Sequence, residues 1–420
     1  MTHAALTLNR TRTRKDISFG IIYLLLGGLI VFALAAGTGG LRSTLVLTSQ
    51  RAGVEILAPE LVTPTATTLY ILGGLILLVG AGQLLFGFKR QGLVLGLVTG
   101  LAIAAFLVWA TRDKSLNLTG MLVSSLVRAT PIALAAIAAI YSERSGVVNI
   151  GIEGMMLAGA FSGVVIASAT GNQLAGVLAG ILTGVLMAAL HAVLSIRYKV
   201  NQIISGTVII ILAVGLTSYL QRALLNEYPD LNSPGPAVAA LAIPGLWRIP
   251  VIGPLLFNQS PFIYLLFLLV ILTQVVLYKT RWGLRLRSVG EHPRAADTLG
   301  VNVFRMRYTA VLISGAISGL AGAYLSVGAA GRFNEGMTAG KGFLGIAAMI
   351  FGNWNPGGAL LGSLIFGFFD SWQEKLSLLQ VGVPVDLLGM APYIATMIVL
   401  AGVVGRSRMP AADGTPYEKE

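Results

Sequence analysis

The residues best suited to chemistry lie in the stretch SERSGVVNIGIEG, Ser142–Gly154, where polar and glycine residues interrupt a long apolar run. Glu153 lies a few residues inside the apolar segment that follows, and Asn149 lies just before that segment. Ionisable groups near a membrane span often serve function, and broken transporter helices present polar groups to a substrate. Alternatively, Glu153 sits in a capped surface turn, where the helix dipole favours it by about 0.3–1 kcal/mol. Both interpretations remain open.

Several classes of enzyme lack support in the sequence. The chain has no cysteine and only three scattered histidines, His3, His191 and His292, so neither thiolate chemistry nor a zinc site is indicated. It lacks the phosphate loop of ATPases, the His-Glu-x-x-His motif of metalloproteases and the Gly-x-Ser-x-Gly motif of lipases. We therefore expect no enzyme activity and no cofactor on this chain. His191 is predicted to hydrogen-bond within a bundle.

The composition is that of a membrane protein. Of 420 residues, 55% are hydrophobic and only 11% are charged. Runs of about 20 apolar residues recur, which is the length needed to cross the hydrocarbon core as a helix. The net charge of +12 comes from arginines and lysines in short gaps between these runs. That pattern favours the positive-inside rule over nucleic-acid binding.

The apolar runs predict an all-α, polytopic transmembrane helical bundle of about 11–12 spans, with both termini cytoplasmic. A hairpin over Phe343–Phe369, around the turn cluster NWNPGG, is the broken or re-entrant helix. The charge-balanced segments Gly37–Thr65 and Gln221–Ser260 suit the outer face. The predicted full-length spans are Ile17–Ala36, Ala66–Phe88, Gly92–Ala110, Leu118–Tyr141, Val147–Ala169, Leu174–Ile196, Ile203–Leu220, Pro261–Tyr278, Tyr308–Gly328 and Leu387–Val404.

A basic segment, Arg281–Arg307, separates two of these spans. It carries six arginines against one glutamate and one aspartate, so the positive-inside rule places it in the cytoplasm. Pro293 lies where a first-turn proline is favoured, and Gly300 lies where a helix ends. The segment therefore predicts about two turns of helix, Arg294–Leu299, outside the membrane. The alternative is a solvated basic loop that only sets topology.

Four stretches together resemble the permease subunits of bacterial ABC importers, within the branched-chain amino acid and simple sugar permease superfamily. Their pairing is similar to the nucleoside-uptake branch, which works with a basic-membrane-protein-type lipoprotein. The likeness covers about Leu118–Arg406. The stretches are SERSGVVNIGIEGMMLAGAF (Ser142–Phe161), NQIISGT (Asn201–Thr207), TRWGLRLRSVGEHPRAADTLGVN (Thr280–Asn302) and FGNWNPGGALLGSLIFG (Phe351–Gly367).

The resemblance implies a multi-pass subunit of the cytoplasmic (inner) membrane that translocates nucleosides. Its expected partners are an ATP-binding subunit that hydrolyses ATP, a second related permease, an extracytoplasmic substrate-binding lipoprotein and membrane lipids, with no nucleic acid. The expected substrate path includes Asn149, Glu153, Asn201 and Gln202. The expected contact with the ATPase is a short coupling helix containing Glu291, Pro293, Ala295, Ala296 and Gly300.

The expected domains are a cytoplasmic tail 1–16, an additional transmembrane region 17–117, a permease core 118–408 and a cytoplasmic tail 409–420. The core contains the coupling loop 280–307. Two features depart from the resemblance: the three N-terminal spans are additional, and Ile210 stands where the branch often has an asparagine. The same machinery could carry simple sugars or branched-chain amino acids. A second alternative is an ion-coupled secondary transporter that works alone.

Overall fold

The computed structural model describes residues 14–51, 54–236, 238–380 and 408–419, with isolated positions between 381 and 407. The predicted last span, Leu387–Val404, and most of the N-terminal tail lie outside the described residues. The chain divides into two compact units. Unit 1 comprises residues 1–122, 248–254 and 372–405, and unit 2 comprises residues 123–247, 255–371 and 406–420.

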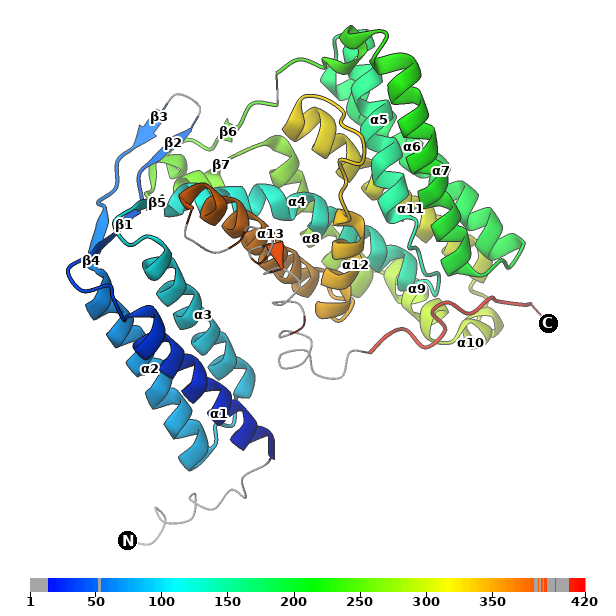
Figure 1. Cartoon of the computed structure of the whole chain (residues 1–420). Helices are drawn as coiled ribbons and strands as arrows, with labels where there is room; N and C mark the ends of the chain where they lie inside the picture. Colours follow the sequence, from blue (N-terminus) through cyan, green and yellow to red (C-terminus); the bar gives the residue numbers. More distant parts are fainter. Residues whose placement is uncertain are drawn as a thin grey trace, which may run out of the picture. The chain divides into compact units, whose positions relative to one another are not determined.

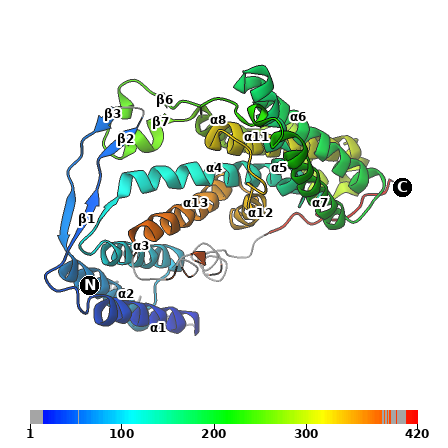
Figure 2. The ribbon, with the colours of Figure 1, turned by 45° about the horizontal axis from the view of Figure 1, so that its top comes forward.

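Unit 1 contains the three additional N-terminal helices: α1 (Arg14–Gly28, continued by a π-helical turn to Leu34), α2 (Thr65–Phe86) and α3 (Gln91–Ala110). Figures 1 and 2 show them as one small group. Glycines let α1 and α2 approach closely, because a Cβ at Gly80 would lie 3.0 Å from the backbone nitrogen of Leu24. At one end the buried carboxylate of Asp16 accepts a hydrogen bond from Gln83 at 3.1 Å.

The segment between α1 and α2 forms strands that the sequence did not predict. β1 (Arg42–Val46) pairs antiparallel with β4 (Leu61–Pro64) and parallel with β5 (Ser115–Asn117). The hairpin of β2 (Ser49–Arg51) and β3 (Val54–Ile56) lies between β1 and β4 in the chain. These short pairings satisfy backbone groups in a segment too polar to form a span.

In unit 2, four helices pack closely: α5 (Ile152–Thr170), α6 (Gln173–Ala192), α7 (Gln202–Leu220) and α11 (Val303–Ala323). Glycines form the contact between α6 and α11, since a Cβ at Gly184 would lie 2.2 Å from the carbonyl oxygen of Gly315. Small residues allow this approach of two helix backbones. π-helical turns extend α6 through Val193–Arg197, α7 through Gln221–Leu225 and α11 through Tyr324–Ala330.

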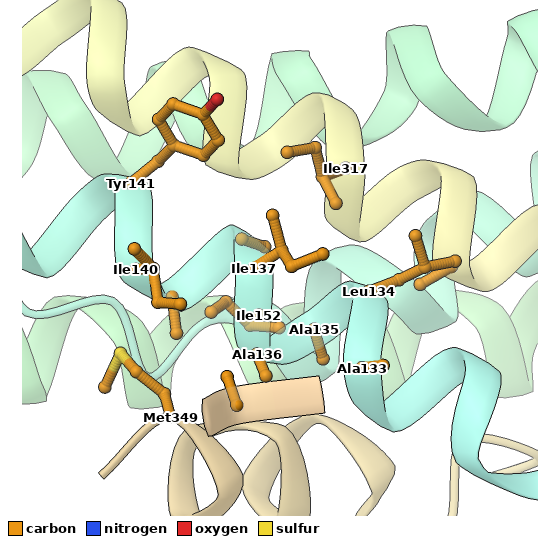
Figure 3. Packing of buried hydrophobic residues seen from close by; sticks show 14 of the residues in the cluster. Ala133, Leu134, Ala135, Ala136, Ile137, Ile140, Tyr141, Ile152, Ile317 and Met349 are labelled. Atoms are coloured by element: carbon orange, nitrogen blue, oxygen red, sulfur yellow. The ribbon is translucent and has the colours of Figure 1, made fainter. Parts of the chain in front are cut away.

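The core of unit 2 is built around α4 (Leu118–Glu143), whose first residues belong to unit 1. Every residue from Ile132 to Tyr141 is buried, as expected for an apolar helix surrounded by other helices. Figure 3 shows side chains of this stretch between Ile317 of α11 and Met349 of α12 (Lys341–Phe351). The helix α8 (Pro261–Lys279) adds Leu266 and Leu277 to the same cluster.

The structure confirms an all-α polytopic bundle. Nine helical segments in the described part of the chain are long and apolar enough to cross a membrane, and they match nine of the predicted spans to within a few residues. The predicted hairpin is formed by α12 and α13 (Pro356–Leu379), which runs farther than the predicted end at Phe369. The segment 221–260 holds turns at Pro229–Asn232, Leu246–Arg248 and Gly253–Phe257 and the pair β6 (Leu241–Ala242) and β7 (Asn258–Gln259).

Candidate functional site

Glu153 joins the start of α5 to the start of α12. Its side-chain oxygens accept hydrogen bonds from the backbone nitrogens of Gly340 at 2.8 Å and Gly342 at 2.6 Å. The carboxylate therefore satisfies free N–H groups at the N-terminus of α12 and carries the charge that this end of a helix favours. The sequence analysis considered only the dipole of the helix that contains Glu153. The membership of Glu153 in a substrate path stays a prediction.

Asn149 lies in the loop between α4 and α5 and is 1% exposed. Its Nδ2 donates to Ser314 Oγ of α11 at 3.1 Å. Its Oδ1 is buried and has no hydrogen-bond partner among the described residues. Buried polar atoms are nearly always paired, so this oxygen is available to a donor that the free chain does not supply.

The other two predicted path residues stand at the start of α7. The Oε1 of Gln202 accepts from the backbone nitrogen of Val148 at 2.6 Å, next to Asn149, so the structure brings these two amides to one region. The Nε2 of Gln202 is also buried without a hydrogen-bond partner in the described part of the chain. Asn201 is exposed and caps α7, because its Oδ1 accepts from the nitrogens of Ile203 and Ile204.

A histidine that was not among the predicted path residues holds this region together. His191 of α6 is fully buried, and its ring nitrogens lie 3.0 Å from Ser205 Oγ of α7 and 3.0 Å from the carbonyl oxygen of Val148. The predicted hydrogen bonding within a bundle is confirmed. A lone polar residue on an apolar helix was the only signal for it, and its partners could not be read from spacing.

Arg128 of α4 pairs with an acid of α13. Its Nη1 lies 3.1 Å from Asp370 Oδ2, and both side chains are about one-third exposed. Two opposite charges inside apolar runs were the available signal. A partly solvated pair of this kind links two helices but contributes little net stability.

The basic segment contains two helices. The predicted short helix is confirmed as α10 (Pro293–Thr298), with Pro293 in its first turn and Gly300 just beyond its end at φ +81°. His292 caps it, because its Nδ1 accepts from the nitrogen of Ala295 at 3.4 Å. The preceding residues form a further helix, α9 (Arg281–Glu291), where the sequence analysis described only a basic loop. Gly283, Leu286 and Val289 of this helix are buried whereas Leu284 is exposed, and the three-residue spacing of the buried positions is a helical periodicity that could have revealed it.

The two alanines of α10 face opposite ways. Ala296 is 3% exposed and packs into the chain's own core, whereas Ala295 is exposed. Leu299, which follows α10 and lies between two spans, is 84% exposed. The outward surface of α10 and its end comprises Arg294, Ala295, Thr298 and Leu299, and Ala296 fixes the helix from within.

Glu291, at the end of α9, is exposed and accepts a hydrogen bond from the nitrogen of Ala411 at 3.3 Å. The C-terminal segment thus lies against the basic segment. Among the described residues no group of three or more histidines or acids could hold a metal ion. The geometry offers a surface for a partner and a buried polar region.

Three curated proteins similar to this chain are permeases. The chain is 40% identical over 305 residues to the guanosine ABC transporter permease protein NupQ of Bacillus subtilis, which covers 70% of this chain and 95% of that protein. It is 40% identical over 310 residues to the nucleoside ABC transporter permease protein NupC of Lactococcus lactis, covering 70% and 95%. It is 35% identical over 330 residues to the putative glucose ABC transporter permease protein TsgC13 of Haloferax volcanii, covering 72% and 98%.

No solved structure matches the chain. The profile of the family described as the branched-chain amino acid transport system permease component matches residues 121–404. This match spans the helices α4 to α13 and leaves out the three N-terminal helices, as the resemblance implied. With nine described helices able to cross a membrane, this chain is a multi-pass membrane protein that belongs to the ABC transporter permease family of branched-chain amino acid transport systems.

Proposed function

We propose that the chain is the membrane-spanning permease subunit of an importer that carries nucleosides across the cytoplasmic membrane. The observation that carries this proposal is the 40% identity to a guanosine permease and to a nucleoside permease, each over 95% of its length. The family profile, which matches residues 121–404, spans the loop around Asn149, the start of α7 and the loop 280–307. The proposal places the chain in transport rather than in catalysis.

The energy for transport would come from ATP hydrolysed on a partner subunit. The outward surface of α10, with Ala295 exposed and Leu299 84% exposed, is the contact that this subunit would use. Both residues lie between two membrane spans. The proposal puts α10 and both chain termini on the cytoplasmic side. The arginines of α9 then meet the anionic headgroups of the cytoplasmic leaflet.

A few direct contacts connect α10 to the buried amides of Asn149 and Gln202. α9 lies directly against the loop after α4, because a Cβ at Gly290 would be 2.3 Å from the carbonyl oxygen of Arg144. That loop leads to Asn149 and then to Glu153, which is bonded to α12. A displacement of α9 and α10 would therefore shift α5 and α12 together and change access to the unpaired amide atoms of Asn149 and Gln202.

The remaining partners follow from the same proposal. A second related permease would complete the pathway, since one chain would supply half of it. An extracytoplasmic lipoprotein would deliver the nucleoside to the opposite face, where the segment between α7 and α8 lies. The N-terminal helices α1 to α3 stand outside the matched region, so transport is assigned to residues 121–404.

A second candidate keeps the machinery and changes the cargo to a sugar. The 35% identity to a putative glucose permease over 98% of its length favours it over other cargoes. The test uses the importer reconstituted with the receptor and ATPase encoded beside it. Receptor loaded with guanosine or another nucleoside is expected to stimulate ATP hydrolysis. Stimulation by glucose-loaded or leucine-loaded receptor, but not by nucleosides, would overturn the nucleoside assignment.

The coupling role of α10 is tested separately. Ala295→Arg places a long charged side chain on the outward surface of α10 without entering the core, so the permease is expected to fold. Receptor-stimulated ATP hydrolysis and uptake should fall, because a helix docked in a groove does not tolerate the added volume. Ala295→Ser is the control, because it keeps a small side chain at the same exposed position. If Ala295→Arg supports native uptake, α10 does not contact the ATPase.

A further inference from the structure

The C-terminal segment Arg408–Lys419 runs along the end of unit 2 that carries α9 and α10, and Figure 1 shows it in red beside α10. It begins at the hairpin of α12 and α13, where the nitrogen of Arg408 donates to Asn353 Oδ1 at 2.8 Å. Near its end, Glu418 pairs with Lys199 between α6 and α7. One short segment thus touches two separate connections between helices.

The middle of this C-terminal segment is bonded to α9. The nitrogen of Ala412 donates to the carbonyl oxygen of Gly290 at 2.9 Å, one residue before Glu291. On the other side, a Cβ at Gly146 would lie 3.0 Å from the carbonyl oxygen of Ala412. The segment is therefore wedged between α9 and the loop that leads to Asn149.

A buried cluster of charged side chains fixes the segment in this position. The carboxyl group of Asp413 faces Glu143 at the end of α4 and Arg307 of α11. Glu143 is 6% exposed and Arg307 is 1% exposed. Arg307 Nη1 also donates to the carbonyl oxygen of Thr415 at 3.0 Å, and Glu143 accepts from Trp354 Nε1 at 2.7 Å. Arg307 therefore ties the segment to α11 through Thr415, whereas both carboxyl oxygens of Asp413 and the Nε and Nη2 of Arg307 are buried without a hydrogen-bond partner in the described part of the chain.

The last residues lie beside α10. The ring of Tyr417, 6% exposed, packs against Phe304 of α11 with centroids 5.4 Å apart. Lys419 Nζ lies 3.7 Å from Asp297 Oδ1 of α10. An open cavity of about 430 Å³ separates the segment from α10, and its walls include Pro293, Arg294, Pro416 and Tyr417. The segment and α10 therefore form one continuous surface with a recess between them.

We propose that the C-terminal segment Arg408–Lys419 is a second element of the coupling apparatus: it contacts the ATPase subunit beside α10 and ties α10 to α4, α11 and the loop before Asn149. This inference rests on the proposed function, since it takes the occupant of the recess to be the ATPase that docks on α10. Continuity with the exposed surface of Ala295 and Leu299 argues for that occupant. Because the segment lies between α9 and the α4–α5 loop, a displacement of α10 by the ATPase would be passed to that loop.

Cross-linking tests the contact, and the chain is well suited to it because it contains no cysteine. Single cysteines are placed at Glu418, at Leu299 on the α10 surface and at Lys89 in the exposed loop between α2 and α3. Each full importer is labelled with a benzophenone maleimide and illuminated. Glu418→Cys is expected to form an adduct with the ATPase subunit as Leu299→Cys does, whereas Lys89→Cys forms none.

The outcomes separate the two proposals. If Leu299→Cys is cross-linked to the ATPase and Glu418→Cys matches Lys89→Cys, the role of the C-terminal segment is overturned and the coupling role of α10 stands. If neither position gives an adduct, both fail. If only Glu418→Cys gives an adduct, the segment contacts the ATPase and the assignment of α10 is wrong.

A functional variant tests whether the C-terminal segment passes movement from the ATPase to the membrane helices. Tyr417→Ala removes the ring that holds the end of the segment on Phe304, and about a tenfold loss of receptor-stimulated ATP hydrolysis is expected, equivalent to about 1.4 kcal/mol. Tyr417→Phe keeps the ring and should stay near native. Native ATP hydrolysis in Tyr417→Ala, together with a lowered unfolding temperature, would make the segment a structural brace only and overturn the proposal.

Discussion

Glu153 and Gly342 are joined by a hydrogen bond of 2.6 Å between the carboxylate of α5 and the backbone of α12. A Cβ on Gly342 would lie 2.7 Å from the same oxygen, so the glycine is needed for the approach. An acid in the first turn of one helix thereby anchors the first turn of another. The two predictions made for Glu153, a cap and a path residue, can be separated by experiment.

Glu153→Ala removes the acceptors for Gly340 and Gly342, and we expect a loss of about 1.5–3 kcal/mol, the range for hydrogen bonds to a charged group. Glu153→Gln keeps one acceptor oxygen and should lose less. Thermal unfolding in nanodiscs measures both. If Glu153 only caps α12, the Gln variant retains the nucleoside concentration for half-maximal uptake. A large increase in that concentration at native stability would place Glu153 in the path.

The crossing of α6 and α11 gives a prediction with a matched control. Gly184→Ala would place a Cβ 2.2 Å from the carbonyl oxygen of Gly315, so the helices must separate, at a cost of about 1–3 kcal/mol. Gly215→Ala in α7 meets no atom within 4 Å and should be neutral or stabilising. Unfolding temperatures of the two variants provide the comparison. Equal stability would contradict the close packing of α6 and α11.

Asn201 allows its two roles to be tested one at a time. Asn201→Ser keeps an oxygen that can cap α7, so stability should change by less than about 0.5 kcal/mol, whereas Asn201→Ala should lose about 1 kcal/mol. If the amide also lines the substrate path, the Ser variant takes up nucleoside more weakly at native stability. Uptake unchanged in Asn201→Ser would remove this residue from the predicted path.

The C-terminal segment should loosen as the pH rises. Burial raises the pKa of Asp413 to about 7, against an ordinary value of 3.8. The folded chain therefore holds a proton that the detached segment would release, and the segment is most stable near pH 4. Its attachment weakens progressively up to about pH 7 and then stays constant. Glu143 and Arg307 are the charged groups that face Asp413.

A spin label on Glu418→Cys reports this attachment as the fraction of immobile spectrum between pH 5 and pH 8. The fraction should fall as the pH rises to about 7. Asp413→Asn is the control, because an amide has no carboxyl proton to release at this position, so its profile should be flatter. A flat profile in the chain with native Asp413 would show that this carboxyl does not control the segment.

The sequence predicted the elements whose signals are local. Apolar runs of about 20 residues located nine described spans, and Pro293 and Gly300 located α10, because length, first-turn proline and terminal glycine act within one element. The strands β1, β4 and β5 were missed because their pairing joins residues far apart in the chain, such as Leu45 with Leu61 and Leu116.

In the candidate site, too, the sequence revealed single residues but not the contacts they make with other elements. Asn149, Glu153 and Gln202 were identifiable as polar residues in an apolar setting. Their partners were not, because Ser314, Gly342 and Val148 come from other elements. The outward direction of Ala295 and inward direction of Ala296 also depend on how α10 packs. The buried contacts of the C-terminal segment join it to four elements, and no spacing in the sequence encodes them.

The central claim is ATP-coupled nucleoside transport by a complex that contains this chain. The direct measurement is uptake of radiolabelled guanosine into proteoliposomes that contain the permeases and ATPase, with receptor outside and ATP inside. We predict uptake that requires ATP and receptor and is lost in Ala295→Arg but not in Ala295→Ser. Guanosine uptake by this chain alone, driven by an ion gradient and unaffected by ATP, would contradict it.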